Sequence, residues 1–345
     1  MAYRLPAEWE KHQATILCWP TNKTDWPGKF VPIYWVYVDI IRRLTESEPV
    51  ILIVKDAAQK ALAERLLAKA YVDPARVQFL ITQTDRNWMR DSCPAFVKDT
   101  KTKQRLVIDM HFDAWSKYDN WKKDAKLPAF LSKKLSSPYI EAGYNDYAVT
   151  LEGGAIDVNG KGTLITTEEC LLDPKQQVRN EGFSKEEYLK VFNTYFGVKN
   201  IIWLEAGIHG DDTHGHVDDI TRFVNANTVL TCRESDSSEL NYPILEANYE
   251  RLQGAKLADG SKPEIVSLPM PKPLSFDGLR LPASYANFYI ANTCVLVPTF
   301  NDPNDRIALG VIADLFPGRS VCGIHAVDLV WGLGTLHCLS HELPA

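Results

Sequence analysis

The chain has 345 residues, of which 45% are hydrophobic and 24% charged, and its formal net charge is −6. This composition is typical of a globular protein that buries its own core, and it excludes disordered and collagen-like chains. The negative charge argues against nucleic acid as a partner and suits a small cationic substrate. The longest apolar runs, such as 49–54, fall far short of the roughly 20 residues that span a bilayer, so we expect no membrane partner.

The cysteines and the first residues exclude two further classes of protein. Seven cysteines are scattered along the chain without a Cys-x-x-Cys pair, which predicts neither a zinc site nor a disulfide framework. The start, MAYRLPAEWEKHQ, lacks a basic stretch followed by an apolar one, so we expect no secretion signal and a cytoplasmic location. Four cysteines lie in apolar, strand-like segments where we expect buried, inert thiols: Cys18, Cys232, Cys294 and Cys322.

The first third of the chain alternates short strands with helices of three- and four-residue apolar spacing. The predicted elements are a strand near 15–19, a helix near 30–45, a strand at 50–54, a helix at 57–70, a strand at 76–82 and a hairpin with a long polar turn at 94–110. The next stretch, 113–144, is rich in Lys, Ser, Pro and aromatic residues and is the most loop-like part of the chain. We interpret it either as an ordered flap over a site or as an irregular insertion.

The rest of the chain repeats one pattern three times: a hairpin, a helical segment and a strand. The hairpins have turns at Asn159, Asn225 and Asn292, which recur about every 66 residues. The hairpins cover 155–167, 220–232 and 286–299, the helical patterns 174–195, 243–252 and 303–315, and the strands 200–204, 264–268 and 320–324. With the two looser copies before them, about five units of about 65 residues fill the chain.

Such a unit cannot bury its apolar face alone, so the copies should pack side by side. No linker long enough to separate domains is visible, and we therefore predict a single α/β domain over residues 1–345. Five units favour a closed radial arrangement over an open solenoid. Polar residues recur at the junctions of the units, and in a radial fold those junctions point toward one axis, which predicts one shared site.

One polar junction is the segment 209–219, HGDDTHGHVDD. It leads into a strand, where alternate residues share a face, so His214, His216 and Asp218 are expected on one side. A histidine beside an aspartate suits general acid/base chemistry. Metal binding by His209, His214 and His216, and purely structural hydrogen bonding, both remain open.

A second junction is 332–338, GLGTLHC, a glycine-rich turn that presents Cys338 beside His337. A cysteine in this setting is a candidate activated thiol, although a buried, inert cysteine is the simpler alternative. The chain has no glycine-rich loop of dinucleotide or P-loop spacing, so nucleotide binding finds no support.

Three carboxylates at the junctions predict the charge of the ligand. Asp91, Glu152 and Asp218 would together form an anionic pocket that suits a planar guanidinium, whose forked donors pair with carboxylates. Trp88, three residues before Asp91, is placed to stack on such a cation. Taken singly, each acid is also compatible with an ordinary turn, and Trp88 with a core aromatic residue.

With these residues in hand, the chain resembles the agmatine deiminase family of the guanidino-group-modifying superfamily. The resemblance covers the whole chain and rests on PAEWEKHQATILCWP at 6–20, NWMRDSCP at 87–94, EGGAID at 152–157, GHVDD at 215–219 and the Cys338 loop. It implies a five-bladed, pseudo-symmetric α/β propeller that needs neither a cofactor nor a metal. The sequence departs from the family pattern at Leu333 and Cys93, where the family usually has glycine.

The resemblance also implies the roles of the site residues. Cys338 matches the family nucleophile and His216 the general acid/base, while Asp91 and Asp218 match the carboxylates that hold the guanidinium. Glu152 and Trp88 match a carboxylate and a wall of the substrate pocket. Agmatine carries a second positive charge at its amine end, and Asp212 is our candidate for binding it.

The function that follows is hydrolysis of agmatine to N-carbamoylputrescine and ammonia, a step toward putrescine and other polyamines. Deimination of peptidyl-arginine or free arginine is the first alternative, and transfer of the amidino group to an amine is another. A metal-dependent hydrolase and a non-catalytic protein that binds guanidines or polyamines represent other classes. The sequence leaves a homo-oligomer open.

Overall fold

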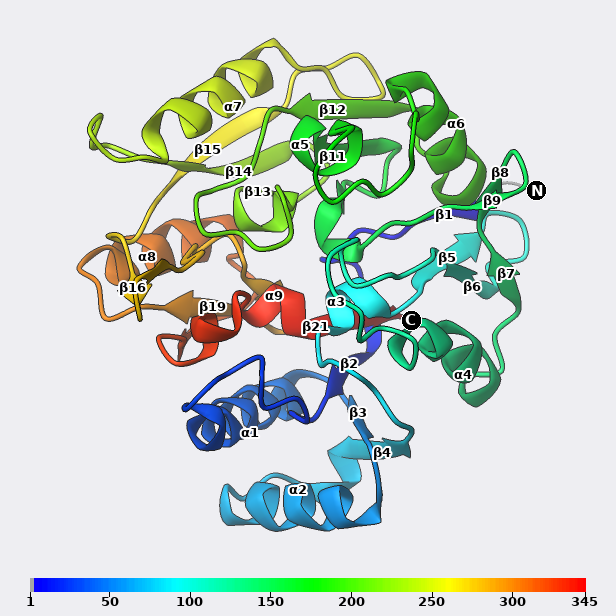
Figure 1. Cartoon of the computed structure of the whole chain (residues 1–345), viewed down its shortest axis with the longest axis vertical. Helices are drawn as coiled ribbons and strands as arrows, with labels where there is room; N and C mark the ends of the chain where they lie inside the picture. Colours follow the sequence, from blue (N-terminus) through cyan, green and yellow to red (C-terminus); the bar gives the residue numbers. More distant parts are fainter. Residues whose placement is uncertain (1–2) are drawn as a thin grey trace. The chain divides into compact units, whose positions relative to one another are not determined.

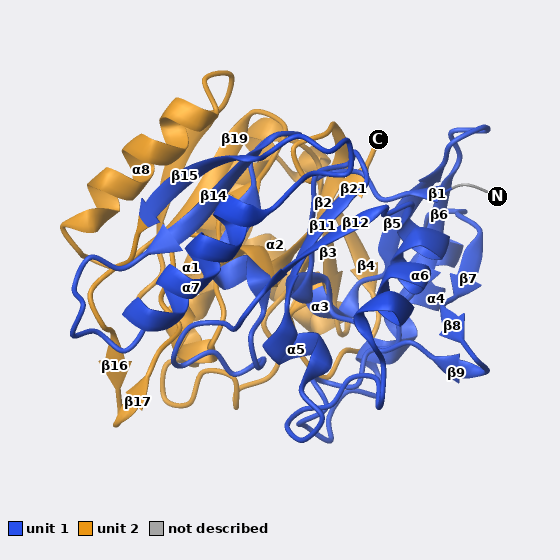
Figure 2. Cartoon of the chain, turned by 90° about the horizontal axis from the view of Figure 1, so that it is seen from above, with its two compact units in different colours: residues 1–7, 91–268 blue, residues 8–90, 269–345 orange. Residues whose placement is uncertain are grey.

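The computed structural model describes residues 3–345, and the chain divides into two compact units (Figure 2). Unit 1 comprises Met1–Ala7 and Asp91–Leu268, and unit 2 comprises Glu8–Arg90 and Pro269–Ala345. The chain changes unit three times: after Ala7, inside the short helix α3 (Met89–Ser92), and after Leu268. Figure 1 labels many of the helices and strands of both units.

Unit 2 contains a four-stranded sheet with the strand order β21-β2-β3-β4. Its strands are β2 (His12–Cys18), β3 (Val50–Val54), β4 (Val77–Ile81) and β21 (Ser340–Pro344). The connecting helices are α1 (Phe30–Ser47) and α2 (Ala57–Lys69), with the 3₁₀ turn η1 (Pro74–Arg76) before β4. β2 pairs antiparallel with β21 and parallel with β3. All five residues of β3 are buried, as expected of a central strand with covered faces.

A second, three-stranded sheet of unit 2 carries the C-terminal repeat. It consists of the hairpin β18 (Tyr289–Ile290) and β19 (Cys294–Thr299), then helix α8 (Asn304–Leu315), then β20 (Ser320–His325), which pairs parallel with β19. A small hairpin, β16 (Ser275–Phe276) and β17 (Leu279–Arg280), precedes it. After β20 come the 3₁₀ turn η5 (Leu329–Gly332) and the one-turn helix α9 (Leu336–Leu339).

Unit 1 contains three sheets of the same kind. The first is β1 (Tyr3–Arg4), β5 (Ala95–Asp99), β6 (Arg105–Asp109) and β7 (Tyr139–Glu141), with η2 (Asp124–Lys126) and α4 (Leu127–Lys134) between β6 and β7. The second is β10 (Asp157–Val158), β11 (Thr163–Thr167) and β12 (Asn200–Leu204), with α5 (Glu168–Leu172) and α6 (Lys185–Phe196). The third is β13 (Thr221–Phe223), β14 (Thr228–Arg233) and β15 (Glu264–Pro269), with α7 (Tyr242–Gly254). The remaining elements are the hairpin β8 (Gly143–Tyr144) and β9 (Tyr147–Ala148), η3 (Gly153–Ala155) and η4 (Val217–Asp219).

The predicted repeat of hairpin, helix and strand is confirmed in four of the five large sheets. In the fifth, β2 pairs with β21 instead of with a neighbouring hairpin strand, and α1 and β3 follow it. Two of the predicted segments were wrong in their content or their bounds. The stretch 113–144 is not wholly irregular, since α4 and β7 supply the helix and third strand of its own repeat. The helix predicted from 174 begins only at Lys185, where Ser184 and Glu187 form a reciprocal capping box.

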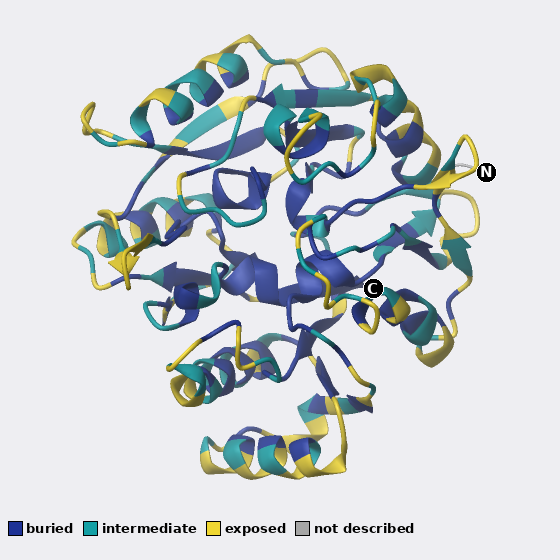
Figure 3. Cartoon of the chain, in the orientation of Figure 1, coloured by how far each residue is buried: buried dark blue, intermediate teal, exposed yellow. Residues whose placement is uncertain are grey.

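Buried hydrophobic residues form the core of each unit. Figure 3 shows which parts of the helices and strands are buried. The core of unit 1 includes Val97, Ile108, Leu164 and Phe192, all fully buried. The seven cysteines form no disulfide within residues 3–345; Cys18, Cys232 and Cys294 are buried as predicted, whereas Cys322 is only half-buried. No helix within residues 3–345 has the length and apolar character required to cross a membrane.

Candidate active site

The cysteine loop, residues 332–338 of unit 2, holds Cys338 in the one-turn helix α9. Asn287, just before β18, holds this loop through both ends of its amide. Its Nδ2 donates to Cys338 Sγ at 3.0 Å, and its Oδ1 accepts from Thr335 Oγ1 at 2.7 Å and from His337 N at 3.0 Å. An amide N–H aimed at sulfur favours the thiolate, the form that attacks carbon. The structure therefore places the predicted nucleophile against a fixed hydrogen-bond donor.

The glycines of the cysteine loop are required by two tryptophans of unit 2. A Cβ on Gly332 would lie 2.5 Å from Trp26 Nε1, and one on Gly334 would lie 2.7 Å from a ring carbon of Trp88 and 3.1 Å from Cys338 Cβ. Trp26 and Trp88 pack together with ring centroids 5.5 Å apart. Trp88 thus lies against the turn that presents Cys338, as its predicted place in the pocket wall requires.

Leu333, between these glycines, has a φ of 67°, in the left-handed region. A leucine in this conformation costs about 1 kcal/mol relative to glycine. Leu333 therefore stands where the family usually has glycine, in a backbone conformation that favours glycine.

The histidine next to Cys338 belongs to a buried charge network in unit 2. His337 Nε2 lies 2.8 Å from Glu8 Oε2, and the same oxygen accepts from Arg90 Nη2 at 2.9 Å. Arg90 Nη1 in turn pairs with Glu342 at 2.9 Å. Because Glu8 also accepts from Ile290 N, this network fixes the chain on both sides of Cys338.

The acidic–histidine cluster of unit 1 consists of His216 and the carboxylates of Asp91, Glu152 and Asp218. His216 Nδ1 lies 3.9 Å from Asp91 Oδ1, and His216 Nε2 lies 3.6 Å from Glu152 Oε2. All four side chains are buried. The structure thus brings four of the predicted site residues together within one unit.

Gly154 packs against this cluster more closely than any side chain could. A Cβ there would lie 2.5 Å from His216 Nδ1, 2.9 Å from Asp91 Oδ1 and 3.1 Å from Asp218 Oδ2. Its backbone N–H donates to Asp91 Oδ1 at 3.0 Å. The second glycine of the EGGAID motif is therefore explained by close approach of the backbone to the charged groups.

We predict that Gly154→Ala abolishes most activity, because His216 and Asp91 must shift to admit the methyl group. We expect a loss of at least about 100-fold in kcat/KM, as an ångström of misplacement in a site can cause. Steady-state assays of the folded variant check this. The matched control is Gly254→Ala, because nothing lies within 4 Å of a Cβ at that position; equal activity of both variants would contradict the close packing.

Glu152 is held by Arg179, whose Nε lies 3.1 and 3.3 Å from the two carboxylate oxygens. Burial raises the pKa of Glu152, but Arg179 and His216 outweigh it and lower the pKa to about 2. Glu152 therefore stays ionised beside His216. Burial lowers the pKa of His216, whereas Asp91, Cys170 and Glu152 raise it, with the net result well above the usual value. The groups around the ring thus favour its protonated form over the neutral one.

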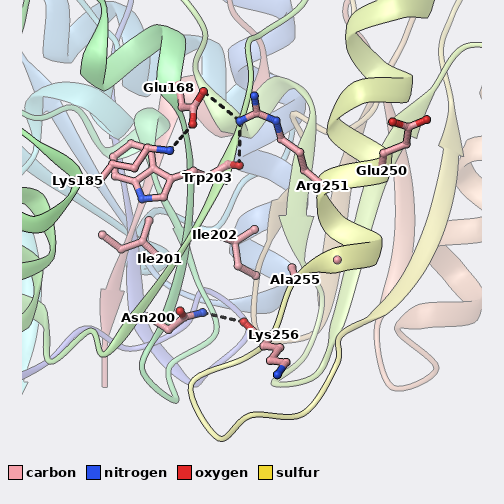
Figure 4. A pocket seen from close by; sticks show the side chains of 11 residues that line it. Glu168, Lys185, Asn200, Ile201, Ile202, Trp203, Glu250, Arg251, Ala255 and Lys256 are labelled. Atoms are coloured by element: carbon pink, nitrogen blue, oxygen red, sulfur yellow. Dashed lines mark hydrogen bonds and ion pairs between the residues drawn. The ribbon is translucent and has the colours of Figure 1, made fainter.

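A shallow pocket of about 430 Å³ on unit 1 offers a contrast (Figure 4). Lys185, Trp203 and Arg251 are among its lining residues. Arg251 pairs with Glu168 at 3.0 Å and Glu205 at 3.1 Å, and these side chains are 31–50% exposed. The ion pairs of this pocket are solvated, unlike the fully buried pair of Glu152 and Arg179.

We predict that Arg179→Met destabilises the protein by about 3–5 kcal/mol, because it leaves the Glu152 charge buried without its partner. Arg251→Met should cost less than about 1 kcal/mol, since solvent screens its pairs. Unfolding in urea at neutral pH measures both values. A similarly small loss in the free energy of unfolding of both variants would show that the buried pair of Glu152 and Arg179 does not stabilise unit 1.

Asp91 is held by two N–H donors, Gly154 N and Trp115 Nε1, the latter at 3.0 Å from Oδ2. Trp115 lies in a loop where Ala114, Trp115 and Ser116 have φ values of 55°, 61° and 51°. Three consecutive left-handed residues are costly, so the surrounding structure must fix this loop. Burial is the main cause that raises the pKa of Asp91 to about 6, with His216 opposing it.

Two residues of the predicted histidine–aspartate face lie elsewhere. His214 has a φ of 66° and its Nε2 contacts Asp173 at 2.9 Å, so the prediction that it shares a side with His216 was wrong. The segment 209–216 is a loop rather than the start of a strand, and His209 is exposed. Within residues 3–345, His209, His214 and His216 do not come together in a group that could hold a metal ion.

Asp212 lies at the surface of unit 1 and is only half-buried. One of its oxygens lies 2.5 Å from Lys117 Nζ, and the other accepts from Tyr118 OH at 2.6 Å. Binding of a substrate amine would therefore require exchange with Lys117, and the role of Asp212 in substrate binding stays a prediction.

Several contacts of the site were missed from the sequence. The segment 113–144 is rich in aromatic residues, but nothing in its sequence pattern indicates that Trp115 donates a hydrogen bond to Asp91. The site contacts that the structure adds are Trp115, Gly154, Cys170, Arg179 and Asn287.

Comparison with known proteins shows to which family this chain belongs. A sequence profile of the Porphyromonas-type peptidyl-arginine deiminase family matches residues 4–344, and the chain belongs to that family. It is 33% identical over 366 aligned positions to a Latilactobacillus sakei protein named "Putative agmatine deiminase", covering 99% of this chain and 96% of that protein.

Solved structures agree with this assignment. The agmatine deiminase of Enterococcus faecalis superposes with a TM-score of 0.91 at 27% identity, over 99% of this chain and 96% of that chain. A C. jejuni agmatine deiminase in which a cysteine is replaced by serine, with substrate bound, superposes with a TM-score of 0.87 at 28% identity, over the same shares. The α/β fold is therefore that of the agmatine and peptidyl-arginine deiminases.

Proposed function

We propose that this protein hydrolyses the guanidinium group of agmatine to N-carbamoylputrescine and ammonia. The observation that carries the proposal is the acidic–histidine cluster, in which buried Asp91, Glu152 and Asp218 surround His216. A site of this charge selects a flat cation. Relatives over the whole chain bear the name agmatine deiminase, and one of them was solved as a cysteine-to-serine variant with substrate bound.

In the proposed reaction, Asp91 and Asp218 hold the guanidinium and keep it cationic, so that its carbon is electrophilic. The Cys338 thiolate attacks this carbon, and the imidazolium of His216 protonates the departing nitrogen. Ammonia leaves, and an amidino-thioether remains on Cys338. Water, deprotonated by the now neutral His216, adds to the same carbon, and the thiolate leaves with release of the ureido product.

The supporting side chains have distinct parts in this scheme. Glu152, fixed by Arg179, orients His216 and keeps it charged, which is a different task from contacting the substrate. Asn287 holds Cys338, and Trp88 forms a wall of the pocket beside the cysteine loop. We assign no residue to the distal amine of agmatine beyond the prediction for Asp212.

The proposal extends to the fold and the location of the protein. Four sheets with the same chain order, and a fifth in which β2 pairs with β21, support a five-bladed propeller that acts as one catalytic domain over residues 1–345. The product would enter putrescine biosynthesis, and the enzyme would work in the cytoplasm. Cell fractionation with an antibody against this chain tests the location.

A substrate panel tests the function. The purified chain is incubated with agmatine, free arginine and an arginine-containing peptide, and ammonia and ureido product are measured. We expect the highest kcat/KM with agmatine. A preference for the peptide or for free arginine would replace agmatine as the substrate. No ammonia from any of the three would refute deimination. Product in the presence of excess chelator separates this chemistry from metal-dependent hydrolysis.

The pH dependence of kcat/KM provides a second test. Asp91 must be ionised to hold the guanidinium, and its raised pKa of about 6 means that activity falls as the pH drops through about 6. His216 must be protonated to act as an acid, and its raised pKa places the alkaline limit well above that of an ordinary histidine. A plateau that continues to pH 4 would contradict the requirement for ionised Asp91.

A further inference from the structure

Cys170, in helix α5, lies beside His216 and has no part in the reaction described above. Its Sγ, a carboxylate oxygen of Glu152 and a ring nitrogen of His216 all lie within 4.8 Å of one another. The three residues are only 2%, 0% and 1% exposed, so water does not compete for these contacts.

The position of this thiol is fixed from both sides of α5. Thr167 caps the helix by accepting from Cys170 N at 3.1 Å, and its hydroxyl donates at 2.5 Å to the carbonyl of Gly215, the residue before His216. A Cβ on Gly215 would lie 2.7 Å from Glu169, so α5 and the histidine segment are in close contact. The cap therefore ties the thiol to the same segment that carries His216.

We propose that Cys170 is a positioning residue for His216: its sulfur, together with Glu152, holds the ring in place and stabilises the protonated form that donates to the leaving ammonia. This inference deepens the proposed function and rests on it. It assigns a task to a cysteine that is neither the nucleophile nor a disulfide partner.

The surroundings of His216 explain why a sulfur atom suits this place. The ring is almost fully buried, yet the carboxylate oxygens of Glu152 and Asp91 lie 3.6 and 3.9 Å from its nitrogens, beyond the length of an ordinary hydrogen bond. A buried imidazolium needs acceptors, and sulfur is a large, polarisable acceptor. The titratable or charged groups near the ring are Asp91 of α3, Glu152 before η3, Cys170 of α5, Asp218 of η4 and, through Glu152, Arg179.

The direction of the effect follows from the role of the ring. Cys170 is one of the groups that raise the pKa of His216 against the lowering effect of burial. Removal of the sulfur should lower that pKa. Because the ring must be protonated to act as an acid, the alkaline limit of activity should then move to lower pH.

The test compares Cys170→Ala and Cys170→Ser with Cys294→Ala, which removes another buried thiol from strand β19 of unit 2. In each full-length variant, kcat and kcat/KM are measured from pH 5 to 10, and the titration of the His216 ring is followed by NMR. We expect Cys170→Ala to move the alkaline limit and the ring titration down by about one pH unit. Cys170→Ser should restore most of the shift, and Cys294→Ala should leave both unchanged.

Several outcomes would overturn the proposal. An equal loss of kcat at every pH, with an unmoved titration of His216, would show that Cys170 only fills space. Unchanged kinetics and titration in Cys170→Ala would show that it has no role at all. If Cys170→Ala does not fold, Cys170→Ser decides the question. A His216 titration and an alkaline limit of activity like those of the wild type would support the proposal. A His216 ring that titrates like an unperturbed histidine would overturn it.

Failure of the proposed function gives a different result. If the wild-type chain releases no ammonia from any guanidine, deimination is refuted, whereas the NMR titration still decides whether Cys170 holds the charged ring.

Discussion

Replacement of Cys338 by serine should lower turnover of agmatine by about 10⁴- to 10⁶-fold while the fold is retained, as for nucleophiles of other covalent hydrolases. The hydroxyl of serine is far less acidic than a thiol, so the variant lacks a nucleophile at neutral pH. The contacts of Asn287 with the backbone of the loop remain available, so the loop should keep its shape. Ammonia release and thermal unfolding, measured on the same sample, check both parts.

The control for this substitution is Cys294→Ser, which places the same hydroxyl in a buried strand instead of the cysteine loop. Its turnover should remain near that of the wild type, with at most a loss of stability. Comparable turnover in Cys338→Ser and the wild type would remove Cys338 from the role of nucleophile.

Asp91→Asn should lower kcat/KM by about 10³-fold, the second-largest effect that we expect. The carboxylate accepts one N–H on each oxygen, from Gly154 and from Trp115. An asparagine has only one oxygen, so its NH₂ group must face one of these donors, and the guanidinium loses its ion pair. A buried donor left unsatisfied costs about 1–3 kcal/mol, in addition to the lost charge.

Steady-state kinetics and urea unfolding separate the two contributions to the Asp91 variant. Asp39→Asn is the matched control, because Asp39 forms an exposed ion pair with Arg42 on α1 and should affect stability by less than about 1 kcal/mol. A kcat/KM near the wild-type value in Asp91→Asn would show that this carboxylate does not hold the substrate.

Much of the fold could be predicted because its unit repeats. The asparagine turns at 159, 225 and 292 and the β-branched strands after them have a local pattern, and the observed hairpins follow it. The helix between β11 and β12 was predicted to begin at 174, whereas the capping box at Ser184 fixes its actual start at Lys185. Between 174 and 184 the large apolar residues are Val178 and Phe183, whose separation of five positions does not indicate a helix.

The predicted site residues lie close together in the structure where a motif combines residue type with spacing. EGGAID and GHVDD bring Glu152, His216 and Asp218 together, because each occupies the junction of a hairpin. His214 was misassigned because a strand was expected, whereas the left-handed conformation of this residue turns it toward Asp173. A single non-helical φ angle is not visible in a residue pattern.

The sequence did not indicate which residues contact the predicted site residues, because these partners lie far away along the chain. Arg179 reaches Glu152 from 27 positions away, and Asn287 reaches Cys338 across 51 positions. Such contacts depend on how loops of different repeats meet, and neither composition nor periodicity contains that information. Cys170 carries no distinguishing mark in the sequence, because it lies outside every motif and polar junction described above.

The central claim is that Cys338 forms a covalent bond to the guanidinium carbon, and trapping that adduct tests it most directly. The chain is mixed with agmatine, quenched in acid during turnover, and analysed by mass spectrometry of the intact protein and its peptides. We predict a mass gain equal to agmatine minus ammonia, on the peptide that contains Cys338 and absent from Cys338→Ser. An adduct on another residue, or turnover of Cys338→Ser at the wild-type rate, would contradict it.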